Sequence, residues 1–537
     1  MKKVLALILA ALMVFSLAAC KGGETQKPDD QTTAAPGGDA TEAPETGEKV
    51  LKIATDGEPE GLFSAYRQGK PTNRIAGAMY NYLVDWDDEN KKPLPSVATS
   101  WEWIGDDYTK IRFTLRDDVY FTNGEKLVGE DVTESFKYNV QNHENYTSFL
   151  DCDNFVVEDD THVVIAMKRP YSNLLDLLGC DYFTIFDWSA WQADVKELGE
   201  EKALTKWQRD PVGSGPYKLA ENGWKSGESV TLVRNEKYWD KENAGYYDKI
   251  VFNFIGDPAS RVNALKAGTV DVAIQLDASQ VEDTQKAGLT VAIYEENVAQ
   301  PLSFNMRNNP ALADENIRKA VLYAVDKTEL ADAYRFSYGK ESKNPLTGQA
   351  SPYYTEIETF SQDLEVAKAA VEEAKKTNGW TDKDLTFTYW QIAGADASEA
   401  ELLKYYCEQV GITLNIETAD FAVVLFDHLF KGDSSIGLGE NDNWDVIRML
   451  NFVDNRVPSS WNAYVGEHEE ELYKLIDTAK DSGKQEDYNK VMQFCVDHYV
   501  CSTVCNTMNF HAFRSDLTGI KYDAHCWPIF WTIHPAK

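Results

Sequence analysis

Short stretches of this chain alternate apolar with polar residues, as strands do when one face is buried. Between Ile111 and Leu115 every second side chain is apolar. Short apolar runs at 50–54, 250–254 and 270–274 predict further strands, the last of them preceded by a helix that ends at Gly268.

Other stretches repeat apolar residues every three or four positions, as helices with one buried face do. One such helix is expected from Glu130, and another follows Asp314, a residue type that favours helix starts. Helical and strand-like segments alternate from residue 363 to residue 416. This alternation predicts an open α/β lobe.

The start of the chain has a different composition. Lys2 and Lys3 precede an apolar run from Val4 to Ser16, too short to span about 30 Å of hydrocarbon and typical of a secretory signal. The run ends in LAAC, which resembles a bacterial lipobox and implies that Cys20 carries lipid. Ordinary cleavage beside an incidental cysteine is the alternative. Residues 20–49 are rich in Gly, Thr, Pro and acids, which predicts a flexible tether.

Acidic residues dominate the charge. The 537 residues carry a formal net charge of −34, which argues against nucleic acid as a partner. Such a surface either keeps an exported protein soluble or attracts cationic ligands. Beyond the signal no apolar run is long enough to cross a membrane, and 43% hydrophobic content allows two or three domains.

The seven cysteines after Cys20 suggest no regular disulfide framework. Cys501 and Cys505 lie near His498 and His511. A metal site there is conceivable, but buried thiols are the commoner outcome, and we expect no metal and no cofactor.

A turn crowded with proline and glycine occupies residues 210–217, and a strand-like segment follows it. Two sequence segments in this region, PVGSGPY at 211–217 and RNEKYW at 234–239, resemble the PVGTGPY and RNPxYW segments of the extracellular solute-binding proteins of peptide-type ABC importers. That family includes oligopeptide-, dipeptide- and nickel-binding members. PSVATSWE at 95–102 and DENIRKAVLYAVDK at 314–327 resemble further family motifs, in the expected order.

The resemblance implies a two-lobed α/β fold like that of periplasmic binding proteins, with an extra domain and two hinge strands near 210–217 and 302–305. We expect lobe I from residues 50–94, 207–305 and 501–537, the extra domain from 95–206 and lobe II from 306–500. Residues 1–19 would be the signal peptide. The implied function is capture of a peptide by closure of the lobes and its delivery to the permease of an ABC importer, by a monomer anchored by lipid on the outer face of the cell membrane.

The segment WDVIRMLNFVDNRVP at 444–458 resembles the cleft strand of oligopeptide binders. By this resemblance Asp454 holds a ligand ammonium group, Arg448 a carboxylate, and Asn451, Phe452 and Val453 the peptide backbone, with Trp444 beside them. Asp454 could instead cap a turn, and Arg448 could form a surface ion pair. The loop 391–398 has no basic residue, so no fixed peptide length is implied.

Aromatic residues make up 12% of the chain, and rings stack on sugars as well as on peptide side chains. An oligosaccharide-binding member of the family is therefore an alternative, and Trp239, Trp444 and Trp461 are left unassigned. The chain has no HExxH, GxSxG, Walker or calcium-loop motif, so we expect no enzyme. A secreted hydrolase with two separated carboxylates is the remote alternative.

Overall fold

The structure is a computed structural model that divides into two units, Met1–Gly47 and Glu48–Lys537. It describes residues 47–66, 70–87, 92–142, 149–179, 183–335, 338–393, 397–420, 423–429, 431, 435–442, 446–457, 460, 462, 464–523 and 527–536. The signal peptide, Cys20 and most of the tether lie outside these residues, as do Trp444 and Trp461. No helix in the described ranges is long and apolar enough to cross a membrane.

A nine-stranded sheet forms the centre of the unit Glu48–Lys537. Its strands run in the order β15-β12-β17-β11-β1-β10-β9-β8, with β16 also paired to β12. β1 lies parallel to β10 and β11, and the other pairs are antiparallel. The strands are β1 (Val50–Thr55), β8 (Tyr217–Lys225), β9 (Ser229–Arg234), β10 (Lys249–Phe254), β11 (Val272–Ala273), β12 (Thr290–Phe304), β15 (Ile436–Leu438), β16 (Asn441–Asp442) and β17 (Ser502–Phe513).

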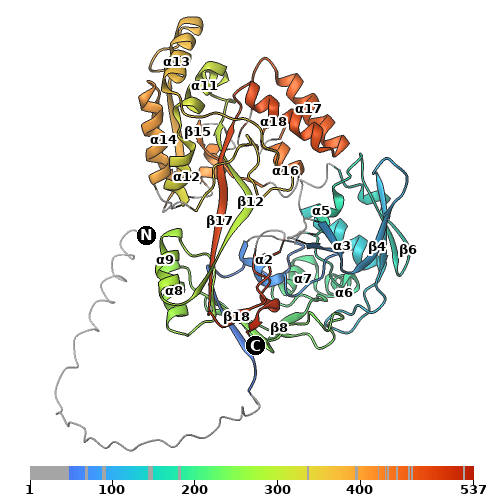
Figure 1. The fold of residues 1–537 in the computed structure, drawn as a ribbon. Coiled ribbons are helices and arrows are strands. Elements are labelled where there is room, and N and C mark those ends of the chain that lie inside the picture. Colours follow the sequence, from blue (N-terminus) through green and yellow to red (C-terminus); the bar gives the residue numbers. More distant parts are fainter. Residues whose placement is uncertain are drawn as a thin grey trace, which may run out of the picture. The chain divides into compact units, whose positions relative to one another are not determined.

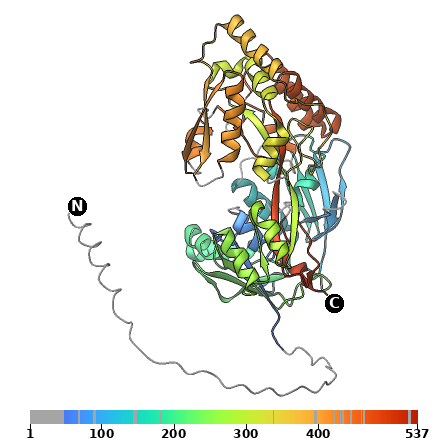
Figure 2. The ribbon, with the colours of Figure 1, turned by 60° about the vertical axis from the view of Figure 1, so that its left-hand side comes forward.

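Two long strands of this sheet, β12 and β17, pair with each other along their length, from Thr290 opposite Phe513 to Leu302 opposite Ser502. At one end β17 also pairs with β11 of lobe I, and at the other end β12 pairs with β15 of lobe II. Figures 1 and 2 show the pair running from one lobe to the other. The expected bridging strand near Leu302 is therefore β12.

The expectation of a second hinge strand at residues 210–217 is wrong, because β17 has that role and β8 begins only at Tyr217, on the sheet edge. The glycines there allow close packing instead. Gly215 N donates to Met79 O at 2.9 Å, and a Cβ at Gly213 would lie 2.1 Å from the same oxygen. The turn therefore fits against the backbone of residues 78–80 and does not cross between lobes.

The extra domain contains a four-stranded antiparallel sheet, β4 (Ala98–Trp103), β5 (Lys110–Leu115), β7 (His162–Ala166) and β6 (Val156–Asp159), with α3 (Gly129–Asn142) and α5 (Leu174–Leu178). Ile111, Phe113 and Leu115 are buried, as their alternation predicted. Two further helices, α6 (Trp188–Leu198) and α7 (Glu200–Trp207), pack Trp191 and Trp207 into the hydrophobic cluster that contains Ile53 and Phe252 of the central sheet.

Lobe II combines a parallel strand pair, β13 (Thr386–Ile392) and β14 (Thr413–Ala419), with a group of helices. Asp314 caps α11 through the amide of Asn316, and Gly379 ends α13 in the left-handed region, as expected from the sequence. The main helices are α11 (Glu315–Ala324), α12 (Lys327–Arg335), α13 (Leu364–Asn378), α14 (Ser398–Gln409), α16 (Val446–Asn451), α17 (Glu469–Ser482) and α18 (Gln485–Asp497).

Shorter elements complete the described part. They are α2 (Lys70–Ala76), β2 (Val84–Asp87), β3 (Lys92–Pro95), η1 (Cys152–Asn154), α8 (Pro258–Lys266), η2 (Ala278–Gln280), α9 (Val281–Lys286), α10 (Pro310–Ala313), η3 (Val424–Leu429), β18 (Leu517–Thr518), η4 (Phe530–Thr532) and β19 (His534–Pro535). The residue boundaries given above for the lobes stay a prediction.

The packing at Gly213 predicts that Gly213→Ala destabilises the protein by about 1–3 kcal/mol, because the new methyl group overlaps backbone atoms that cannot move alone. Gly57→Ala is the matched control, since a Cβ there meets no atom within 4 Å. Denaturant unfolding of both variants measures the difference. Equal midpoints for the two variants would contradict this account of the turn.

Candidate ligand-binding site

A cavity of about 660 Å³ lies among α2, the β2–β3 hairpin, the loop after β9 and the C-terminal residues 521–532. This is within the range of roughly 300–1,000 Å³ typical of small-ligand sites. All its lining residues belong to lobe I or the extra domain. Many are aromatic, among them Tyr82, Trp86, Trp239, Tyr522, Trp527 and Trp531.

The most unusual group in the cavity wall is the guanidinium of Arg74, on α2, whose side chain is only 1% exposed. It forms an ion pair with Asp56 and lies 3.8 Å from the ring centroid of Trp527. Burial lowers the pKa of Arg74 to about 10, although the charges of Asp56 and Glu296 oppose this. The group is therefore still a cation at neutral pH.

Two nitrogens of Arg74, Nε and Nη2, are buried and have no hydrogen-bond acceptor among the described residues. Leaving a buried donor unsatisfied costs about 1–3 kcal/mol, and more for a charged group. Nε and Nη2 form one edge of the planar guanidinium fork, the geometry that binds a carboxylate through two parallel hydrogen bonds. A bound anion would satisfy both.

His511, on β17, is a second buried group in this region. Its Nδ1 accepts a hydrogen bond from the backbone N of Gln275 at 3.2 Å, so the proton of the neutral ring is on Nε2, which has no acceptor among the described residues. The ring packs near Tyr522 and Trp527, with centroids 6.3 and 6.0 Å away. Burial, together with the charge of Arg74, lowers the pKa of His511 to about 3. His511 is thus a neutral donor.

The cavity also has an acidic part. Asp85 lines the cavity and is exposed. The surrounding protein still desolvates its carboxylate and raises its pKa, despite the Trp86 amide at 2.9 Å and the charge of Lys521. The charge of Asp240 raises it further. A cationic group of a ligand would stabilise the ionised carboxylate. The aspartates that line the cavity are Asp85, Asp87, Asp240 and Asp523.

The cavity is linked electrostatically to the bridging strands. Their pairing shifts register between Glu295 and Ala299, and at this irregularity Asn506 Nδ2 donates to Glu296 O at 2.9 Å. The buried carboxylate of Glu296 accepts a hydrogen bond from Asn509 and interacts with the charge of Arg74. A ligand anion at Arg74 would therefore change the balance of charge beside β12 and β17.

The segment that resembles a cleft strand has a different conformation from the one expected. Residues 446–451 form the helix α16, with Val446, Ile447, Met449 and Leu450 buried. The backbone N of Phe452 donates to Arg448 O at 3.2 Å, and Ser460 Oγ donates to Phe452 O at 2.7 Å. The apolar pair Val446-Ile447 is followed three residues later by the pair Met449-Leu450. This spacing is a helical signal that the strand interpretation missed.

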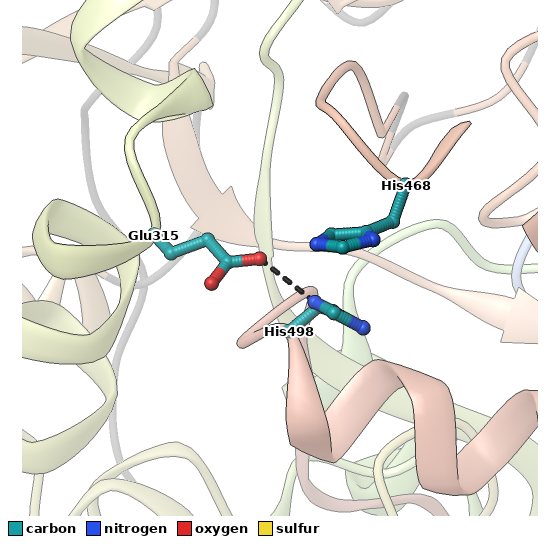
Figure 3. Close-up of side chains that lie close together, drawn as sticks. All are labelled: Glu315, His468 and His498. Atoms are coloured by element: carbon teal, nitrogen blue, oxygen red, sulfur yellow. Dashed lines mark hydrogen bonds and ion pairs between the residues drawn. The ribbon is translucent and has the colours of Figure 1, made fainter. Parts of the chain in front are cut away.

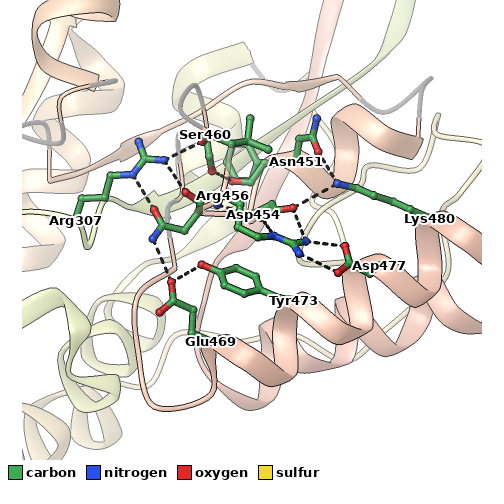
Figure 4. Close-up of polar contacts among 12 residues, drawn as sticks. Arg307, Asn451, Asp454, Arg456, Ser460, Glu469, Tyr473, Asp477 and Lys480 are labelled. Atoms are coloured by element: carbon green, nitrogen blue, oxygen red, sulfur yellow. Dashed lines mark hydrogen bonds and ion pairs between the residues drawn. The ribbon is translucent and has the colours of Figure 1, made fainter. Parts of the chain in front are cut away.

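Asp454 lies three residues after the end of this helix and is 2% exposed (Figure 4). Arg456 donates to its carboxylate from Nε and Nη2, both at 2.9 Å, and Lys480 Nζ lies 3.4 Å away. Burial raises the pKa of Asp454, but these two cations outweigh it and the net pKa lies below the ordinary value. In this arrangement the counter-charge of Asp454 comes from the chain itself.

The structure thus brings Arg448, Asn451, Phe452, Val453 and Asp454 together in one helix and turn of lobe II. Asn451 Oδ1 accepts from Lys480 Nζ at 2.7 Å, and Phe452 and Val453 are buried. Trp444 lies outside the described residues. The roles of all six residues in ligand binding stay predictions.

The sequence interpretation missed Arg74 and Asp85, and it considered His511 only as a conceivable metal ligand. The only local signal for Arg74 is a cation beside the apolar run that starts at Ile75. Trp239, left unassigned before, lines the cavity. Cys501 and Cys505 are buried, and burial raises the pKa of Cys501 well above its usual range.

The depressed pKa of His511 predicts a pH-dependent stability. Below pH 6.5, the usual histidine pKa, the unfolded chain takes up a proton here and the native protein, with a pKa of about 3, does not. Between pH 7 and pH 5 the free energy of unfolding should fall by about 2 kcal/mol because of this residue. The free energy of unfolding of His511→Gln should not show this fall. From pH 7 to pH 8 the unfolding free energies of the variant and the wild type should change in parallel. Identical slopes below pH 6.5 in denaturant titrations would contradict the buried neutral state.

Comparison with known proteins gives consistent results. The model of "Bacterial extracellular solute-binding proteins, family 5 Middle" matches residues 92–464. Heme-binding protein A of Haemophilus influenzae is 27% identical over 453 residues, 78% of each chain, and the probable D,D-dipeptide-binding periplasmic protein DdpA of Escherichia coli is 25% identical over 83% of this chain and 86% of its own.

Solved structures show the same fold. The substrate-binding protein CtaP of Listeria monocytogenes has a TM-score of 0.78 at 24% identity, covering 91% of this chain and all of its own. DppA of Helicobacter pylori, in complex with the peptide STSA, has a TM-score of 0.74 at 19% identity, covering 91% of this chain and 98% of its own. The motif resemblance and the two-lobed α/β fold are thus confirmed, and the chain belongs to family 5 of the bacterial extracellular solute-binding proteins, the binding proteins of ABC importers.

Proposed function

We propose that this chain captures short peptides with free ends in the cavity beside Arg74 and delivers them to the permease of an ABC importer. The observation that supports this most directly is the pair of opposite charged regions in one aromatic cavity. Arg74 has two donors for a carboxylate that meet no acceptor among the described residues, and the pKa of Asp85 stays raised although the charge of Lys521 opposes the shift. A zwitterion satisfies both regions at once.

The aromatic walls also suit the rest of such a ligand. Peptide side chains of different kinds bury apolar area against Trp and Tyr rings, whose N–H and O–H groups form occasional hydrogen bonds. Broad selectivity follows, because the two ends of the peptide are held by charge and the side chains mainly by apolar contact. Among family members, the Helicobacter pylori structure holds a peptide, STSA.

An oligosaccharide is the second candidate, and the same aromatic rings favour it. A neutral sugar, however, leaves Arg74 and Asp85 without charged partners. A hydrolase is the remote third candidate. Incubation with peptides separates it from a binder, since a binder returns them intact.

End-capped peptides should distinguish these proposals. For a peptide that the protein binds, calorimetry should show at least tenfold weaker binding after C-terminal amidation and also after N-terminal acetylation. Removing one partner of a buried charge pair costs about 2–5 kcal/mol. Arg74→Gln should weaken binding of the free peptide by a similar factor. Amidation of the peptide should then reduce the affinity of this variant little further, because both changes remove the same interaction. Arg112→Gln, an exposed arginine paired with Glu158, is the matched control.

The ammonium site is tested in the same way with two carboxylates. If Asp85 holds the ammonium group, Asp85→Asn should bind free and acetylated peptides alike. If Asp454 holds it, as the motif resemblance implies, this loss of sensitivity should appear in Asp454→Asn instead. Equal binding of free and capped peptides by the wild type, or binding of a sugar and no peptide, would contradict the peptide proposal. Unchanged circular dichroism must accompany each variant.

We further propose lipid anchoring through Cys20 on the outer face of the membrane, by a chain that acts as a monomer. The support is the short apolar run that ends in LAAC. Cys20→Ala should then release the protein into the medium and abolish labelling by radioactive palmitate. Retention of the variant in the membrane fraction, with an unlabelled wild type, would contradict the anchor.

A further inference from the structure

Three metal-ligating side chains converge in lobe II, far in sequence from one another (Figure 3). Glu315 is the first residue of α11, His468 directly precedes α17, and His498 directly follows α18. One possible ligand atom from each lies within 4.8 Å of the other two. Glu315 Oε1 is 2.8 Å from His498 Nδ1, and the two imidazole centroids are 4.2 Å apart.

Two imidazoles and one carboxylate form a donor set that suits Zn²⁺ and neighbouring divalent transition metals. In a tetrahedral zinc site, with bonds of about 2.0–2.1 Å, ligand atoms are roughly 3.3 Å apart. The pair at 2.8 Å would therefore move slightly apart and His468 slightly closer. The side chains of Glu315, His468 and His498 are 40%, 42% and 19% exposed, which leaves room for this adjustment and for entry of an ion.

The surroundings hold the ligands in place. Arg318 is fully buried and donates to the backbone carbonyls of Leu312, Ala313, His498 and Tyr499 at 2.7–3.0 Å. It thereby fixes the start of α11 against the end of α18. These carbonyls accept from four of its five N–H groups, and Glu315 Oε1 lies 3.9 Å from Arg318 Nη2, beyond hydrogen-bond distance.

His468 also has a suitable second partner. Its Nδ1 lies 3.7 Å from a carboxylate oxygen of Glu471, and Figure 3 shows the opposite side of the ring turned toward Glu315 and His498. Metal-bound histidines commonly donate their other N–H to a carboxylate, which fixes the tautomer. Glu467, Glu469 and Glu470 beside it add negative charge that attracts cations.

We infer that Glu315, His468 and His498 form a binding site for one divalent transition-metal ion, with Zn²⁺ as the representative probe. The ion joins α11 to the α17–α18 pair and so stabilises lobe II. The site shares no residue with the cavity in lobe I, and the inference does not depend on which solute the protein carries.

Titration of the chelator-treated full chain with ZnCl₂ by calorimetry tests this inference. One equivalent should bind, and the double variant His468→Gln/His498→Gln should bind at least about 100-fold more weakly. Glu315→Gln should bind Zn²⁺ at least about tenfold more weakly than the wild type. Co²⁺ should give the visible absorption of a site with nitrogen and oxygen ligands, and Zn²⁺ should raise the melting temperature of the wild type but not of the double variant.

His162→Gln is the matched control, because His162 lies 2.9 Å from Asp159 Oδ1 but belongs to no cluster of three ligands among the described residues. It should bind Zn²⁺ like the wild type. Unchanged affinity in the double variant, or a Co²⁺ spectrum dominated by thiolate ligands from the cysteines, would overturn the assignment. An unchanged circular dichroism spectrum of the double variant, measured in the same preparation, confirms that it is folded.

Discussion

The antiparallel pairing of β12 with β17 is the constraint on which the rest of the molecule depends. These strands are the members of the large sheet that extend into both lobes, so the lobes share one set of hydrogen bonds. The irregularity between Glu295 and Ala299 interrupts the pairing in its middle, where the buried amide of Asn506 donates to the backbone carbonyl of Glu296 and that of Asn509 to the Glu296 carboxylate. Such an interruption is where a strand pair bends most easily, and a closure of the lobes would use a bend there.

The charges beside that bend explain why a ligand would matter to it. Arg74 and Glu296 are buried and Asp56 is partly exposed, and two donors of Arg74 meet no acceptor among the described residues. A ligand carboxylate would supply the missing acceptors and change the net charge next to β12. Contacts such as Asn173 with Tyr353, 3.4 Å apart, already join the extra domain to lobe II. A ligand that binds more tightly when the extra domain contacts lobe II shifts the population of conformations toward that contact.

Much of the fold could be predicted from the sequence, because periodic burial and caps are local. The alternation at Ile111–Leu115, the cap at Asp314 and the stop at Gly379 all appear as expected. The site could not be predicted, because it depends on distant pairings. Asp454 pairs with the neighbouring Arg456 but also with Lys480 on another helix, and Arg74 meets Trp527 across most of the chain. Nothing local to Asp454 or Arg74 specifies the contacts with Lys480 and Trp527.

The central claim is that the cavity beside Arg74 holds the ligand, and a crystal structure with a bound peptide carrying bromophenylalanine tests it most directly. The account predicts an anomalous bromine peak among the aromatic walls near Trp86 and Trp527, with the peptide carboxylate within hydrogen-bond distance of Arg74 Nε and Nη2. A bromine peak beside α16 and Asp454, with no peptide density in the cavity, would contradict it.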